Sequence, residues 1–222
     1  MTTCTKWKGR NQSLPYPQPW EYVKDHLFKG NKVPGTFIEI GATDGVDGSN
    51  THFFESEWGW SGLCIEPNPV MYNLLKDNRP NVINCAVGDV NEKKTFCVVH
   101  GYASPLSCIV EYASEQHMNR IDMEVSRHGG QKEYIEIEVR TLDDILTQYG
   151  INHIDYLSID VEGAEESVLS NINFASCSVD VITAEHNEYD QSNVNKILSE
   201  NNFDFKTKIC ADNVYVRRGF YK

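Results

Sequence analysis

The sequence contains no apolar run near the roughly 18 residues that a membrane span needs. Its first residues also lack the apolar segment of a secretory signal peptide. Cysteine is present at seven positions, an odd number, and no C-x-x-C pair typical of a metal or redox site occurs. We therefore expect a cytoplasmic protein whose cysteines are reduced core residues.

Positive charge is also scarce, because 20 Lys and Arg residues face 32 Asp and Glu residues, for a net charge of −12. Affinity for nucleic acid depends on neutralising phosphates, so this balance argues against nucleic acid as a partner. Residues 1–35 are the exception, with six basic and two acidic side chains. We expect an N-terminal arm and short helix at 1–35, followed by one domain at 36–222.

Apolar strand-like segments alternate with amphipathic helical segments along residues 36–201. This alternation predicts an α/β fold with a mostly parallel sheet and helices on both of its faces. The expected strands are 36–40, 62–66, 81–87, 95–99, 134–140, 154–161 and 179–184, with a final hairpin at 203–221. The expected helices are 49–58, 69–79, 142–149, 165–169 and 192–201. Residues 100–133 break the alternation and read as an insertion.

A glycine-containing turn follows the first strand, in the segment Glu39-Ile40-Gly41-Ala42-Thr43-Asp44-Gly45. Glu66 ends the second strand 25 positions after Gly41, where an acidic side chain can bind the hydroxyls of a ribose. Each feature alone also fits an ordinary strand end. Together they indicate an adenosine-containing cofactor, leaving NAD and S-adenosylmethionine open. Glu39 favours a ligand with sulfonium and ammonium groups, since an acidic side chain there suits a pyrophosphate poorly.

A second group of polar side chains follows two later strands. Asp160 and Glu162 come after the strand 154–161, and Glu185 and His186 come after the strand 179–184. Carboxylates with an imidazole can bind a divalent cation such as Mg²⁺, or can orient and deprotonate a hydroxyl. We take Asp160, Glu162 and His186 as candidate catalytic residues, with His186 as the base and Asp160 or Glu185 orienting it. Asp160 and Glu185 are also candidate metal ligands. Glu165 and Glu166 are typical of a helix N-terminus.

These stretches resemble the FkbM family of S-adenosylmethionine-dependent methyltransferases. The resemblance covers residues 37 to about 187, and the stretches Glu66-Pro67-Asn68 and Asp160-Val161-Glu162-Gly163 are specific in combination. The segments that carry the resemblance are Phe37–Gly45, Ser49-Asn50-Thr51, Gly59–Asn68, Ala86-Val87-Gly88-Asp89, Arg140–Asp144 and Ile159–Glu165.

The resemblance implies a Rossmann-like fold with seven strands, of which the last is antiparallel. It implies a cofactor site for S-adenosylmethionine, and O-methylation of a hydroxyl on a small molecule, sugar or glycan. In that site the turn residues hold the methionine part, Glu66 the ribose, and Ala86 and Val87 the adenine. The candidate cofactor-binding residues are Glu39, Gly41, Ala42, Gly45, Asn50, Glu66, Pro67, Ala86 and Val87.

Two other functions fit the same residues. A nucleotide-linked oxidoreductase needs a phosphate-binding turn, which the segment 41–45 matches poorly because it lacks the G-x-G-x-x-G pattern. A catalytically silent scaffold would bind S-adenosylmethionine without turnover. Under the methyltransferase hypothesis, we expect residues 100–133 to cover the acceptor, since long irregular insertions are often functional.

Overall fold

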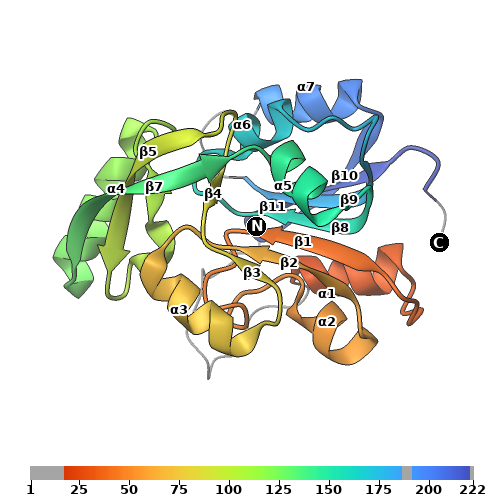
Figure 1. Cartoon of the computed structure of the whole chain (residues 1–222), viewed down its shortest axis with the longest axis horizontal. Coiled ribbons are helices and arrows are strands. Elements are labelled where there is room, and N and C mark those ends of the chain that lie inside the picture. The colour runs from red at the N-terminus through yellow and green to blue at the C-terminus, as the bar shows by residue number, and fades with distance from the viewer. Residues whose placement is uncertain (1–17, 187–191, 221–222) are drawn as a thin grey trace.

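The computed structural model describes residues 18–186 and 192–220 (Figure 1). The predicted N-terminal arm lies outside the described residues up to position 17. From there, the helix α1 (Pro19–Tyr22) leads into the π-helix η1 (Val23–Leu27). Val23 and Phe28 are completely buried and belong to an aromatic core that includes Phe54 and Trp60. The end of the expected arm is therefore packed onto the domain.

The main sheet has seven strands in the order β10-β11-β9-β8-β1-β2-β3. Strands β3, β2, β1, β8 and β9 run parallel, whereas β11 is antiparallel to both of its neighbours. The predicted Rossmann-like sheet with an antiparallel last strand is confirmed. The strands are β1 (Thr36–Ile40), β2 (Ser61–Ile65), β3 (Val82–Ile83), β8 (His153–Ile159), β9 (Ser178–Glu185), β10 (Phe203–Ile209) and β11 (Asp212–Arg217).

Helices cover both faces of this sheet, as predicted (Figure 1). On one face, α5 (Leu142–Tyr149), α6 (Glu165–Ser170) and α7 (Ser192–Glu200) pack against strand residues such as Ile38 and Ile40. On the other face, α2 (His52–Trp58) and α3 (Pro69–Asn78) pack with η1 against residues such as Phe37. The alternation of Phe37 and Ile38 between the two cores is the period of two expected for a strand buried on both faces.

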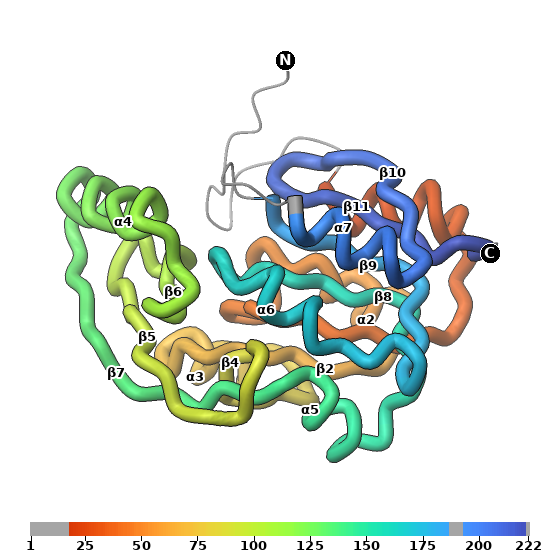
Figure 2. The backbone as a smooth tube through the Cα atoms, turned by 90° about the horizontal axis from the view of Figure 1, so that it is seen from above, coloured from red at the N-terminus to blue at the C-terminus, as the bar shows by residue number. Residues whose placement is uncertain are grey.

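A second sheet lies beside the main one, in a region that we call the side lobe (residues 86–140). It has the order β4-β7-β5-β6, with β4 (Ala86–Val87), β5 (Glu92–His100), β6 (Cys108–Ile109) and β7 (Gln131–Arg140). The short 3₁₀-helix η2 (Ser104–Leu106) and the helix α4 (Glu115–His128) complete it. Figure 2 shows the side lobe standing away from the main sheet.

The side lobe changes three expectations. The strands expected at 95–99 and 134–140 are present, but they pair with each other in the second sheet. The strand expected at 81–87 is split between the two sheets, as β3 and β4. The chain therefore leaves the main sheet near residue 86 and returns to it near residue 140. This segment extends beyond the stretch 100–133 at both ends.

The six cysteines in the described part of the chain are free, and all but Cys210 are buried. Burial raises the pKa of the Cys85 and Cys108 thiols to about 12, so these side chains stay protonated near neutral pH. This placement agrees with their predicted role as small core residues.

None of the helices between residues 18 and 220 that the structure describes combines the length and the apolar character required to cross a membrane.

Candidate active site

The turn after β1 lies against the end of β8. Gly41 has φ of +81°, and a Cβ atom placed on it would lie 1.7 Å from the carbonyl oxygen of Asp160. The backbone N–H groups of Gly41 and Ala42 both donate to the carbonyl of Ile65, at 2.9 and 3.1 Å. Residue 41 must therefore be glycine, and the turn joins the carboxyl ends of β1, β2 and β8.

Glu66 lies buried at the end of β2, facing the same turn. Its carboxylate accepts hydrogen bonds from the backbone N–H of Thr43 at 2.8 Å and of Asn68 at 2.7 Å. Burial raises the pKa of Glu66 to about 7, and these two bonds only partly oppose the shift. Pro67 stands between Glu66 and Asn68, and the Asn84 side chain donates to the Glu66 carbonyl at 2.8 Å. The carboxyl is thus fixed in place at the strand end.

Glu39 is buried on β1, and its side chain contacts the loop that follows the turn. One carboxylate oxygen accepts from the Asn50 N–H at 2.7 Å, and the other accepts from the Ser49 and Thr51 hydroxyls, each at 2.8 Å. The Arg79 guanidinium donates to the second oxygen at 3.4 Å. These bonds give Glu39 the task of holding the loop 49–51 in shape. A direct contact of Glu39 with a cofactor stays a prediction.

Asn50 and Gly45 complete the predicted turn. The Asn50 amide donates to the Ser158 hydroxyl on β8 at 3.1 Å, so the loop is tied to the next strand. Gly45 has φ of +80°, and a Cβ atom there would lie 2.5 Å from side-chain atoms of both Arg79 and Leu75. Asn50 therefore ties the loop 49–51 to β8, and Gly45 allows the turn to pack closely against Arg79 and Leu75.

Ala86 and Val87 form β4, the first strand of the side lobe. Both side chains are buried, and their residues pair with Val139 and Arg140 of β7. The two residues sit where the chain passes from the main sheet into the side lobe. Their predicted contact with adenine is not tested by these contacts.

Three carboxyl groups converge at the carboxyl ends of β8 and β9. Each of Asp160, Glu162 and Glu185 offers one oxygen, and these oxygens lie within 4.8 Å of one another. Asp160 reaches solvent, but surrounding protein atoms and the charges of Glu185 and Glu162 raise its pKa well above the ordinary value. Glu162 adopts φ of +52°, a conformation that non-glycine residues rarely take. The predicted residues at these two strand ends, except His186, thus form one group.

His186 lies outside that group. Its backbone N–H donates to the Ala211 carbonyl at 2.6 Å, which ties it to the start of β11. Its Nδ1 atom is buried and has no hydrogen-bond partner among the described residues. Within the same residues, no hydrogen bond or ion pair joins His186 to Asp160, so the orientation of His186 by Asp160 stays a prediction.

Sequence reasoning missed the buried role of Glu165, which it explained as a helix N-terminal residue. The Glu165 carboxylate accepts from the N–H groups of Val161 and Gly163, both at 3.3 Å. Burial, followed by the charge of Glu185, raises its pKa to about 7. Glu165 therefore supports the loop that carries Glu162.

The side lobe also contacts this loop, through α4. His117 Nδ1 lies 3.4 Å from a Glu162 carboxylate oxygen, and Arg120 Nη1 lies 3.8 Å from the same oxygen. His117 Nε2 is 3.0 Å from the Leu106 carbonyl, which orients the imidazole. These residues have no local sequence signal, because the contact joins segments more than 40 positions apart.

Comparison with known proteins identifies the relatives of this chain. The FkbM methyltransferase domain family matches residues 39–205. The 2-O-methyltransferase NoeI of Sinorhizobium fredii is 26% identical over 145 residues, which are 63% of this chain and 58% of NoeI. This chain thus spans little more than half the length of that curated relative.

A solved FkbM methyltransferase structure shares the fold of this chain. The FkbM methyltransferase of Methylobacillus flagellatus superposes with a TM-score of 0.50 at 17% identity, over 88% of this chain and 47% of its own. The N-terminal domain of human METTL16 aligns with a TM-score of 0.48 at 12% identity, over 95% of this chain and 73% of its own.

Proposed function

Because this chain belongs to the FkbM methyltransferase family, we propose that it transfers a methyl group from S-adenosylmethionine to a hydroxyl oxygen of a sugar, glycan or other small molecule. NoeI is a 2-O-methyltransferase, which supports oxygen as the acceptor atom. The acidic charge of the chain argues against a nucleic-acid acceptor.

One observation carries this proposal. The turn at Gly41 lies against the backbone of Asp160, so the candidate cofactor site and the group of three carboxyls share one edge of the sheet. In open α/β sheets, ligands bind at the carboxyl ends of the strands. A cofactor on the turn and an acceptor beside the carboxyls would meet there.

The residues around the turn fit S-adenosylmethionine. Both carboxylate oxygens of Glu66 lie at the end of β2. Each oxygen accepts one backbone N–H and can also accept a hydrogen bond from a ribose hydroxyl. The methionine part would lie along the backbone of Gly41 and Ala42. When bound, the cofactor supplies a methyl group on a sulfonium, so the protein has to align the acceptor oxygen and remove its proton.

Asp160 is the best candidate for the base that accepts this proton. It keeps access to solvent where an acceptor can enter, and it lies against the turn that would hold the cofactor. Glu162 and Glu185 would bind the acceptor or share the proton with Asp160. His186 remains a second candidate base, tested by the His186→Ala variant.

The same three carboxyls also fit a divalent cation. Three oxygen donors within 4.8 Å match the all-oxygen ligands that Mg²⁺ prefers. Asp160 and Glu185, with Glu162, would hold the ion, which would lower the pKa of an acceptor hydroxyl. Addition of a chelator separates the two mechanisms, because only the cation-dependent one loses turnover and recovers it with Mg²⁺.

The side lobe would cover the acceptor from the other side. Its helix α4 already contacts Glu162 through His117 and Arg120. Arg120, whose side chain is 22% exposed, would face a hydroxyl-rich acceptor held between the side lobe and the main sheet, and the buried His117 would hold Glu162 in place.

Transfer of isotopically labelled methyl from S-adenosylmethionine to a panel of sugars and glycans tests the proposed function. We expect wild type to label at least one hydroxyl acceptor. A positioned base contributes about 10²–10⁴-fold in rate, so Asp160→Asn should lose turnover on that scale. Cofactor binding without transfer to any acceptor would instead support the silent scaffold.

A further inference from the structure

A histidine and two aspartates meet at the edge of the main sheet opposite to the candidate active site. His153 is the first residue of β8, Asp155 is the third, and Asp180 is the third residue of the neighbouring β9. Strand β8 rises by about 20 Å over its length, so this group lies far from Asp160 at the other end of the same strand. It serves no step of the proposed methyl transfer.

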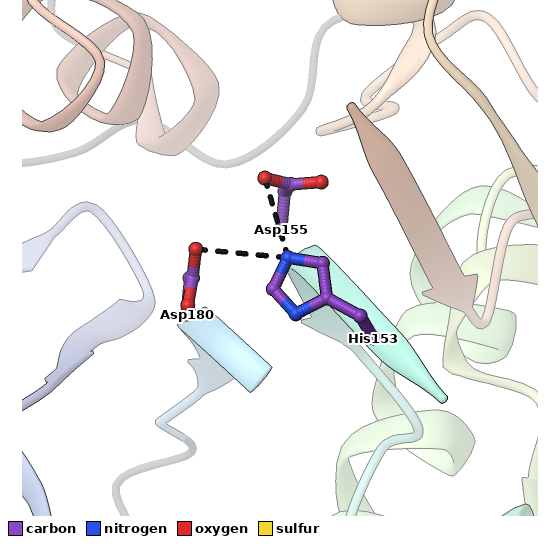
Figure 3. A group of neighbouring side chains, drawn as sticks. All are labelled: His153, Asp155 and Asp180. Atoms are coloured by element: carbon purple, nitrogen blue, oxygen red, sulfur yellow. Dashed lines mark ion pairs between the residues drawn. The ribbon is translucent and has the colours of Figure 1, made fainter. Parts of the chain in front are cut away.

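The three side chains point at one another. Figure 3 shows His153 Nε2 facing both carboxylates, at 3.5 Å from Asp155 Oδ1 and 3.8 Å from Asp180 Oδ2. One atom of each side chain lies within 4.8 Å of the others. Two donors bound at 2.0–2.2 Å to a tetrahedral ion lie about 3.3–3.6 Å apart. The arrangement is thus close to that of a metal site.

The remaining atoms of these side chains are held by outer partners. The second oxygen of Asp155 accepts from the Thr36 N–H at 2.8 Å, and that of Asp180 accepts from Arg217 at 2.6 Å. His153 Nδ1 lies 2.7 Å from the Ser178 hydroxyl, and donation to that hydroxyl leaves the Nε2 lone pair toward the carboxylates. Such outer partners orient metal-binding histidines and carboxylates.

The group is open to solvent on one side, and paired strands hold its three side chains in place. Both aspartates are buried, whereas the His153 side chain is 40% exposed, so one side of the group is open to solvent and to a water ligand. All three ligands lie on paired strands, and Thr36 and Arg217 belong to β1 and β11. An ion here would tie together four strands of the main sheet.

We propose that His153, Asp155 and Asp180 bind a divalent transition-metal ion of the zinc class, with water as the remaining ligand. One nitrogen and two carboxylate oxygens with an open fourth position are ligands that Zn²⁺ accepts. The alternative is a protonated His153 that bridges the two carboxylates without a metal.

Titration of the untagged, chelator-treated full chain with Co²⁺ and then Zn²⁺ tests this site. We expect one equivalent of Co²⁺ to give visible absorption of a four-coordinate ion, and Zn²⁺ to displace it. Zn²⁺ at a hundredfold excess over Kd should raise Tm by roughly 5–10 °C. Absence of both signals in wild type would overturn the proposal in favour of the protonated bridge.

Two variants locate the ion. His153→Ala should weaken metal binding at least tenfold. Because His153 is partly exposed, the Tm of this variant without metal should match that of wild type. His100→Ala removes another accessible histidine and should bind like wild type. A wild-type Co²⁺ signal in His153→Ala, or loss of the signal in His100→Ala, would place the ion elsewhere and contradict the proposal.

Discussion

At the scale of single residues, Gly41 decides whether the turn after β1 can approach β8. An added Cβ would overlap the Asp160 carbonyl, and the positive φ adds strain of about 1–2 kcal/mol. We expect Gly41→Ala to lower the free energy of unfolding by more than about 3 kcal/mol in urea titrations.

Gly59 is the matched control for this substitution. It has φ of +71°, but a Cβ atom there would meet nothing within 4 Å. Gly59→Ala should therefore lose only the backbone term of about 1–2 kcal/mol. Equal losses in the two variants would show that the close approach of Gly41 to Asp160 does not matter.

Glu66 makes stability depend on pH. Its pKa is about 7 in the folded chain against 4.5 for the ordinary group, so the folded chain binds more protons between these values and loses stability as pH rises from 4.5 to 7. Glu66→Gln should remove on the order of 3 kcal/mol from the total change in stability over this pH range. The pKa values of Glu165 and Asp160 are raised as well, so part of the pH dependence should remain.

Urea unfolding at several pH values between 4.5 and 7.5 measures this effect. Glu57 is exposed on α2, and Glu57→Gln should keep the wild-type slope. An unchanged slope in Glu66→Gln would mean that the folded chain does not hold a proton at Glu66.

At the scale of elements, the contact of α4 with the loop after β8 should affect acceptor turnover more than cofactor binding. The double variant His117→Ala/Arg120→Ala removes both side chains that reach Glu162. We expect kcat to fall about tenfold, since a small misplacement of a reacting group lowers the rate, while the Kd for S-adenosylmethionine stays unchanged.

Arg127→Ala is the control, because this arginine lies on the same helix and its side chain is 67% exposed. It should keep wild-type turnover. If the double variant also keeps wild-type turnover, α4 does not position the acceptor site.

The elements of the main sheet could be predicted from the sequence, because burial on both faces leaves continuous apolar runs such as residues 36–40. The partners of the side-lobe strands could not. Residues 134–140 alternate cleanly and predict a strand, but nothing local states that they pair with 92–100 rather than with the main sheet. Likewise Glu165 has the local pattern of a helix start, and only the tertiary fold buries it.

At the scale of the whole molecule, the fold places two groups of ionisable side chains at opposite ends of β8 and β9. The carboxyl edge has Asp160, Glu162 and Glu185, and the amino edge has His153 and its two aspartates. The strand ends at the carboxyl edge were predictable from chain order, because parallel strands end on the same side. The group at the amino edge has no sequence motif and emerges from strand pairing.

The acidic group at the carboxyl edge should act as a unit. We expect Asp160→Asn and Glu162→Gln each to reduce methyl transfer, and the double variant to lose much less than the product of the two single losses. Steady-state rates with labelled cofactor measure this, after circular dichroism shows that each variant is folded. Fully multiplicative losses would mean that the two carboxyls work independently.

The central claim is that the turn after β1 and Glu66 form a site for S-adenosylmethionine. Calorimetric titration of wild type, Glu66→Ala and Glu57→Ala with this compound tests it most directly. We expect one equivalent to bind to wild type and to Glu57→Ala with the same Kd. Loss of hydrogen bonds to the Glu66 carboxylate is worth about 1.5–3 kcal/mol, so Glu66→Ala should raise Kd roughly tenfold to hundredfold. Absence of binding to folded wild type, or an unchanged Kd in folded Glu66→Ala, would contradict the claim.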